Sequence, residues 1–146
     1  MRVLLQRVSK VSLSVEGNVV VSIGRGYLAL VAIRESDTES ELEWMASRIP
    51  QLRLFEDENE KLNRSLMEVG GEILSVSQFT LYGDVRKSRR PSFSHAAPPE
   101  AAERYWRRFN QLLRNAGVPV SEGVFGAMME ITLTNAGPVT LMLERE

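Results

Sequence analysis

The first third of the chain alternates between hydrophobic and polar positions in the way that β-strands do. In residues 11–15, VSLSV, valine and leucine lie on one face and serine on the other. The sequence EGN at 16–18 supplies a loop that contains glycine, so residues 11–24 are predicted to form a hairpin. Residues 27–33, YLALVAI, are apolar throughout, which is typical of a central strand buried on both faces.

Two segments have helical spacing instead. The first helix is predicted to begin near Thr38, which forms a capping-box pattern with Glu41, and to end at Pro50. The second is predicted to begin at about Pro99 and to end at Gly117. Its apolar stripe consists of Ala102, Tyr105, Trp106, Phe109, Leu112 and Leu113.

The remaining segments indicate further strands. Residues 52–66 are expected to form a strand, an acidic turn and a return, and residues 72–83 a single strand. The last two strands are expected at 128–134 and 139–143, with Asn135–Pro138 as a tight turn between them. The predicted fold is therefore α+β: one domain over residues 1–146, with a curled, barrel-like sheet of mainly antiparallel or mixed strands and two main helices packed on it.

Composition removes several kinds of chemistry. The 146 residues include no cysteine, which excludes disulfides, thiolate catalysis and cysteine zinc sites. A single histidine, His95, excludes a multi-histidine site, and no spacing of carboxylates suggests a metal held by oxygen ligands, so we expect no metal. We expect no cofactor either. The net charge of -1 argues against a protein that coats nucleic acid indiscriminately. The sequence predicts no signal peptide and no membrane span, and hence a cytoplasmic protein.

Two polar segments are candidates for function. Ser77, Gln78 and Thr80 follow an apolar run, and they need hydrogen-bond partners unless the strand is an edge strand with a solvated polar face. In the second segment four cations occur within five residues, with an aromatic residue shortly after: Arg86, Lys87, Arg89, Arg90 and Phe93. Such a loop suits phosphates and a stacked base, although a solvated surface loop has the same composition.

Two other features are weaker candidates. His95 lies among small residues with no nucleophile-elbow motif nearby, so a catalytic histidine is disfavoured. Gly123 and Gly126 allow a close backbone approach to a ligand, or simply a turn that enters a strand. The residues alone thus indicate an α+β domain, with RNA binding as an open option.

Four segments taken in order are more specific than any of these features: MRVLLQRV, VGGEILSVSQFTLYGD, RRPSFSHAAPPE and FGAMMEITLTNAGPVTL. Together they resemble the D-aminoacyl-tRNA deacylase (D-tyrosyl-tRNA deacylase) family of the bacterial and eukaryotic type, from Met1 to Leu143. The two diagnostic motifs are Ser-Gln-x-Thr, here Ser77–Thr80, and Asn-x-Gly-Pro, here Asn135–Pro138. The resemblance departs at Ser88, where glycine is usual, and at His95.

The resemblance implies a homodimeric hydrolase acting in translation quality control. It cuts the ester between a D-amino acid, or glycine, and the terminal adenosine of tRNA. A cis Gly137–Pro138 peptide of one subunit is expected to enter the active site of the other and to exclude L-amino acids at the α-carbon, supported by Asn135 and Arg7. The active sites would then lie at the subunit interface, without a cofactor.

The resemblance also suggests a mechanism. Backbone N–H groups around Gln78, Phe79 and Thr80 are expected to stabilise the oxyanion, while the ribose 2′-hydroxyl or a water held by it assists attack. An older proposal for the family makes the Thr80 hydroxyl a nucleophile. The basic loop, with Phe93, is expected to contact the acceptor end of the tRNA.

Two alternatives remain open at this point. One is a non-catalytic nucleic-acid-binding module that uses the basic loop and the arginine-rich second helix. The other is a relaxed relative that edits L-alanyl-tRNA and holds the Gly137–Pro138 bond in the trans form.

Overall fold

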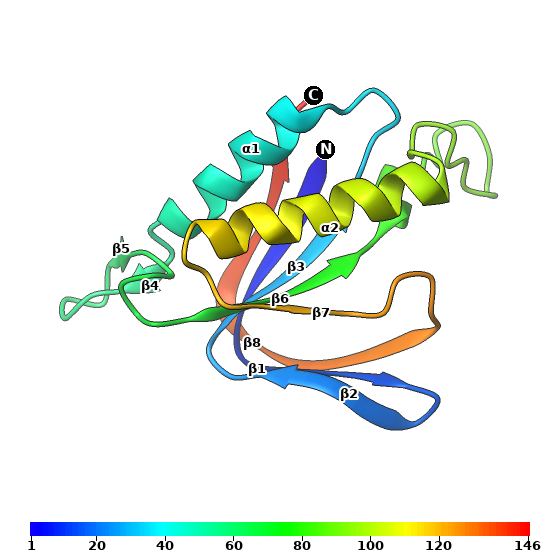
Figure 1. Cartoon of the computed structure of the whole chain (residues 1–146). Helices are drawn as coiled ribbons and strands as arrows, with labels where there is room; N and C mark the ends of the chain where they lie inside the picture. The colour runs from blue at the N-terminus through cyan, green and yellow to red at the C-terminus, as the bar shows by residue number, and fades with distance from the viewer.

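A curled mixed sheet is the main element of the protein, whose computed structural model describes residues 1–146 (Figure 1). Its strands are β1 (Arg2–Val15), β2 (Asn18–Ile23), β3 (Gly26–Ala32), β6 (Glu72–Ser77), β7 (Val120–Glu122) and β8 (Met129–Glu144). They follow the order β2-β1-β3-β6-β7. On β1, β3 pairs with residues 2–8 and β2 with residues 11–15, while β8 pairs along the whole length from residue 2 to residue 15. The pairs β3–β6 and β6–β7 are parallel and the pairs formed by β1 are antiparallel. The predicted curled α+β fold is confirmed.

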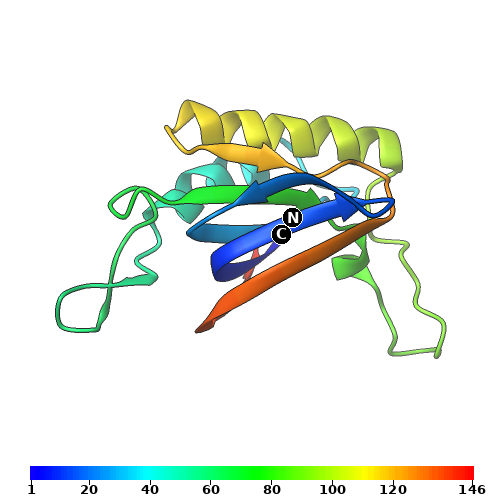
Figure 2. The same ribbon diagram turned by 90° about the horizontal axis from the view of Figure 1, so that it is seen from below.

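The helices α1 (Glu39–Arg48) and α2 (Pro99–Asn115) cover one face of this sheet, as Figure 2 shows. The predicted capping box is present: the Thr38 N–H donates to Glu41 Oε2 at 2.6 Å, and the Thr38 hydroxyl accepts from the Ser40 N–H at 3.3 Å. The short 3-10 helix η1 (Ile49–Gln51) follows α1 because Pro50 cannot continue the helical ladder. No helix in the structure has both the length and the apolar character that crossing a membrane requires.

The main core lies between the helices and the sheet. Trp106 of α2 is buried there, and its indole N–H donates to the buried Ser75 hydroxyl of β6 at 2.9 Å. This bond satisfies both polar groups inside the core. It also fixes α2 over the strand that leads to Ser77.

The C-terminal strand corrects one prediction. Residues 129–144 form one continuous strand, so Asn135–Pro138 is not the turn of a hairpin. The segment is a bulge in β8: the register against β1 shifts between Gln6 and Val8, and again between Val8 and Lys10. Proline has no N–H for the ladder, and the Asn135 amide replaces part of it by donating to the carbonyls of Arg7 at 2.9 Å and Val139 at 3.2 Å.

The segment at 72–83 corrects a second prediction. The strand β6 ends at Ser77, and the 3-10 helix η2 (Phe79–Tyr82) follows it. The Gln78 N–H still donates to the Val31 carbonyl at 2.7 Å, but the chain then leaves the sheet. The strand alternation expected for Ser77–Thr80 therefore does not exist. In contrast, the predicted strand, turn and return near residue 60 are present as β4 (Phe55–Glu56) and β5 (Leu62–Arg64).

Candidate active site

An open cleft of about 970 Å³ lies beside the end of β6. Ser77, Gln78 and Phe79 line it on one side, and the segment from Phe125 to Ile131 lines it on another. Eleven of its 20 lining residues are hydrophobic, so it suits an aromatic or apolar group held by a few polar contacts. Its volume is at the upper end of the range for small-molecule sites.

The polar residues of the first motif form a local pair at the edge of this cleft. The Gln78 amide donates to the Thr80 hydroxyl at 2.5 Å. Thr80 itself is exposed and does not line the cleft. No histidine or carboxylate hydrogen-bonds its hydroxyl, so no base is positioned to activate it. This arrangement favours a role for Thr80 in shaping the site over a role as nucleophile.

The second motif lies elsewhere in the chain. Gly137 and Pro138 are exposed, the peptide bond between them is cis, and neither residue lines the cleft. The two motifs therefore do not form one site within a single chain. They can meet only if a second chain brings its bulge to the cleft.

Arg7 holds the bulge from inside the protein. Its guanidinium donates to the carbonyls of Ala136 at 3.0 Å and Gly137 at 3.3 Å. The same group donates to the Leu54 carbonyl at 2.7 Å and to Glu56 Oε1 at 3.1 Å. Arg7 is almost fully buried, and its charge is paired with Glu56. The structure thus brings Arg7 and Asn135 together at the bulge.

The cations of the basic loop differ in their bonding. Arg86 is not a free cation, because its guanidinium binds both oxygens of Asp84, at 2.9 and 2.7 Å. These hydrogen bonds hold the pKa of Asp84 far below its ordinary value. Lys87, Arg89 and Arg90 are exposed and make no ion pair.

Phe93 joins the basic loop to the cleft. Its ring packs edge-to-face on Phe79 with centroids 5.1 Å apart, and both rings line the cleft. The chain returns to Gly83 at this point, where a side chain would meet Phe93 Cε1 at 3.0 Å. Glycine therefore permits the close contact between η2 and the returning loop.

Sequence reasoning missed part of the cleft wall. Phe125, Met128 and Met129 line it, and Met128 is 91% exposed. The only signal in the sequence is the pair Gly123 and Gly126, which allows either a close backbone approach to a ligand or a turn that enters a strand. Gly126 has a φ of +75°, a conformation that glycine adopts without strain and that turns the chain along the cleft.

Comparisons with known proteins identify the family of this chain. The model of the family described as D-Tyr-tRNA(Tyr) deacylase matches residues 4–144. The chain belongs to this family. A D-aminoacyl-tRNA deacylase of Exiguobacterium sp. (strain ATCC BAA-1283 / AT1b) is 55% identical over 99% of both chains. One of Thermomicrobium roseum is 56% identical over 99% of this chain and 94% of its own length.

Two solved structures are also similar. A protein described as c-Myc DNA Unwinding Element Binding Protein is 42% identical, with a TM-score of 0.95 over 100% of this chain and 99% of its own. A probable eukaryotic D-amino acid tRNA deacylase has a TM-score of 0.83 at 23% identity, over 97% of each chain, which supports the fold alone. The resemblance to the deacylase family and the expected enzyme class, a hydrolase of aminoacyl-tRNA esters, are therefore confirmed.

Proposed function

We propose that this chain hydrolyses the ester bond of D-aminoacyl-tRNA and releases free tRNA and the D-amino acid. The observation that carries the proposal is the family match over residues 4–144 together with the cleft beside Ser77–Phe79. An apolar cleft with few polar groups suits the terminal adenosine and an amino acid of any side chain. Selection then has to act at the α-carbon, which all amino acids share.

The proposed selection comes from a second copy of the chain. In a homodimer, the bulge at Gly137–Pro138 of one subunit enters the cleft of the other and leaves no room for an L side chain. Two facts support this arrangement: the bulge is exposed and lies outside its own cleft, and Arg7 and Asn135 fix its backbone. Each carbonyl has two lone pairs, so Gly137 keeps one for a substrate after accepting from Arg7. Glycine has no side chain, and the glycyl ester is the expected second substrate.

In the proposed reaction, the protein stabilises the oxyanion with groups of η2. Water, assisted by the ribose 2′-hydroxyl, attacks the ester carbonyl; the bond from carbon to the ribose 3′-oxygen then breaks, and that oxygen takes the proton. Because the Gln78 N–H is already bonded to Val31, the donors left for the oxyanion are the N–H groups of Phe79 and Thr80. Cations of the basic loop, Lys87, Arg89 and Arg90, contact the acceptor end, with Arg86 oriented by Asp84.

The role of Thr80 has a direct test. If its hydroxyl only shapes the site, Thr80→Ser and Thr80→Ala both retain turnover, with kcat lowered by less than about tenfold. A covalent nucleophile predicts retention in Thr80→Ser and loss of about 10⁴-fold or more in Thr80→Ala. Single-turnover hydrolysis of D-tyrosyl-tRNA measures both variants.

One alternative has specific support. The similar structure named as a DNA unwinding element binding protein is 42% identical, and a non-catalytic nucleic-acid-binding module would use the same basic loop. Hydrolysis of D-aminoacyl-adenosine, which has no phosphate backbone, separates the two functions. The deacylase hydrolyses this ester, whereas a binding module leaves it intact. A relative that edits L-alanyl-tRNA would instead hydrolyse the L-alanyl ester readily.

A further inference from the structure

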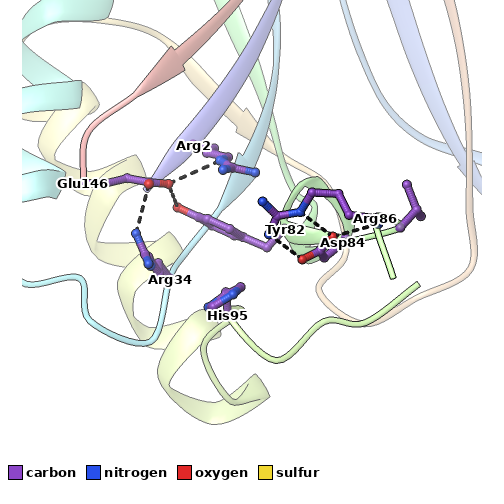
Figure 3. Close-up of a pocket in the computed structure, with 9 residues that line it drawn as sticks. Arg2, Arg34, Tyr82, Asp84, Arg86, His95 and Glu146 are labelled. Carbon is purple, nitrogen blue, oxygen red and sulfur yellow. Dashed lines mark hydrogen bonds and ion pairs between the residues drawn. The ribbon is translucent and has the colours of Figure 1, made fainter. Parts of the chain in front are cut away.

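A second, smaller pocket of about 350 Å³ lies at the C-terminal end of η2, where Tyr82, Gly83 and Asp84 line it (Figure 3). It differs from the cleft in its chemistry: three arginines and His95 line it, opposed by Asp84 and Glu146. Arg86 is bound to both oxygens of Asp84, whereas the charges of Arg2 and Arg34 meet at Glu146. Of the basic loop proposed to contact tRNA, only Arg86 lines this pocket.

A carboxylate already lies between these two cations. Figure 3 shows Arg2, Arg34 and Tyr82 pointing toward the side chain of Glu146. Arg34 Nη1 lies 2.9 Å from Glu146 Oε2, and the Tyr82 hydroxyl donates to Oε1 at 3.2 Å. Although burial raises the pKa of Glu146, the Tyr82 hydroxyl and the charges of Arg2 and Arg34 lower it by more, so the group is an anion at neutral pH. Arg2, Arg34 and Tyr82 therefore already bind one carboxylate in the folded chain.

Arg2 is incompletely bonded in this arrangement. Its Nη1 donates to the Leu81 carbonyl at 2.9 Å, and its guanidinium stacks on the Tyr82 ring at 4.5 Å. Its Nε is buried and makes no hydrogen bond, although oxygens of Glu144 and Glu146 lie 3.3 Å away. A donor left without an aligned acceptor indicates that Glu146 is an imperfect partner.

The pocket and the cleft share their dividing wall. Phe79 lines the cleft and Tyr82 lines the pocket, about 6 Å further along the same 3-10 helix. On the returning loop, Ala96 lines the cleft and its neighbour His95 lines the pocket. A nucleotide strand whose terminal nucleoside lies in the cleft thus needs only a short step to place a phosphate in the pocket.

We propose that Arg2, Arg34 and Tyr82 form a binding site for a backbone phosphate of the RNA strand that ends in the cleft, and that Glu146 occupies this site until RNA displaces it. A phosphodiester, like the carboxylate, carries one negative charge on two free oxygens, which guanidinium groups bind as a pair. The inference rests on the proposed function for the identity of the RNA. It adds a site that the basic loop alone does not provide.

The test uses the full chain and a non-acylated RNA hairpin that ends in CCA, with fluorescence anisotropy at several salt concentrations. Arg34→Gln removes one phosphate contact, so Kd rises about fivefold and the slope of log Kd against log salt falls by about 0.7. Glu146→Gln removes the competing anion, so Kd falls about threefold. A gain in affinity cannot come from a folding defect, which keeps the result interpretable.

Two matched variants separate the pocket from general charge effects. Glu35→Gln removes the same charge next to Arg34, but Glu35 is exposed and does not line the pocket, so screening keeps its effect on Kd within about 1.5-fold. Arg48→Gln removes an exposed cation at the end of α1. Equal shifts for Glu146→Gln and Glu35→Gln, or for Arg34→Gln and Arg48→Gln, would overturn the proposal.

Failure of this site and failure of the proposed function give different results. The function is judged by the wild-type protein alone, on D-aminoacyl-adenosine, which has no backbone phosphate. Hydrolysis of that ester together with equal effects of the paired variants overturns the phosphate site and leaves the function intact. Absence of hydrolysis overturns the function, and the RNA-binding series still decides whether the pocket holds a phosphate.

Discussion

The strand β1 carries two arginines, Arg2 at its start and Arg7 near its middle, and the two are bonded in opposite ways. Arg7 donates to three carbonyls and one carboxylate, and its side chain is 6% exposed. Arg2 makes one hydrogen bond, and its buried Nε has no hydrogen bond although the carboxylates of Glu144 and Glu146 lie 3.3 Å away; its side chain is 29% exposed. The hydrogen bonds of Arg7 are all made within the fold. Arg2 borders a pocket and has a donor that can still bind an acceptor.

This difference separates an arginine that supports the backbone from one that can bind a ligand. A fully bonded cation in a dry site fixes the backbone around it, because moving any partner leaves a charge unsatisfied. An incompletely bonded cation loses little when a better acceptor replaces its partner. On this argument Arg7 positions the bulge at Gly137, and Arg2 is the arginine that we propose for RNA binding.

The largest expected effect comes from Arg7→Ala. The change leaves the carbonyls of Leu54 and Ala136 without their donor and removes a buried side chain, so the unfolding free energy falls by about 3–5 kcal/mol. For a domain of this size, Tm falls by about 10 °C. Thermal unfolding followed by circular dichroism measures it. The exposed control Arg48→Ala changes stability by less than about 0.5 kcal/mol, and an equal loss in both variants would contradict the comparison.

A smaller effect is expected from Glu56→Gln. Glu56 is half exposed and contacts Arg7 at 3.1 Å, so its charge orients the guanidinium without holding the fold. The amide keeps the shape and loses the ion pair, which loosens Arg7 against the carbonyls of Ala136 and Gly137. We expect the preference for D-tyrosyl-tRNA over L-tyrosyl-tRNA to fall by about three- to tenfold.

The control for Glu56 is Glu58→Gln on the same acidic loop, which pairs with Arg64 and not with Arg7. It should retain the full preference. If the D-to-L ratio falls in both variants, or in neither, the contacts from Glu56 through Arg7 to the bulge have no part in the selection of D-amino acids.

The smallest effect concerns pH and Glu146, the partner of Arg2. Because the pKa of Glu146 lies below its ordinary value of 4.5 in the folded protein, the group stabilises the fold above its unfolded pKa. That contribution disappears as pH falls through the lower, folded pKa. Wild type should therefore exceed Glu146→Gln in Tm at pH 7, by the equivalent of less than about 1 kcal/mol. The two Tm values should converge below about pH 4. A constant difference across this range would exclude an ionised Glu146 as the cause.

Local patterns predicted the elements that local chemistry determines. The capping box at Thr38, the start of α2 at Pro99 and the hairpin loop at Gly17 are set by neighbouring residues, and each is where the sequence indicates. The cleft was partly predictable, because Ser77 and Phe79 line it and belong to the Ser-Gln-x-Thr motif that resembles the deacylase family.

Non-local pairing explains the errors. Asn135–Pro138 has the composition of a turn, but β1 is long enough to pair with both flanking segments, so the chain continues as one bulged strand. The Arg2–Arg34–Glu146 pocket joins residues from distant parts of the sequence, with no spacing that reveals it. Likewise, the polar run after Ser77 forms a 3-10 helix because Gln78 remains tied to Val31 while Phe79 turns to meet Phe93.

The most direct test of the central claim is deacylation of matched D-tyrosyl-, L-tyrosyl- and glycyl-tRNA by the purified protein. A site that reads only the α-carbon should release D-tyrosine and glycine rapidly. It should leave the L-tyrosyl ester at its uncatalysed rate. Hydrolysis of the L-tyrosyl ester at a rate comparable with that of the D form would contradict the account.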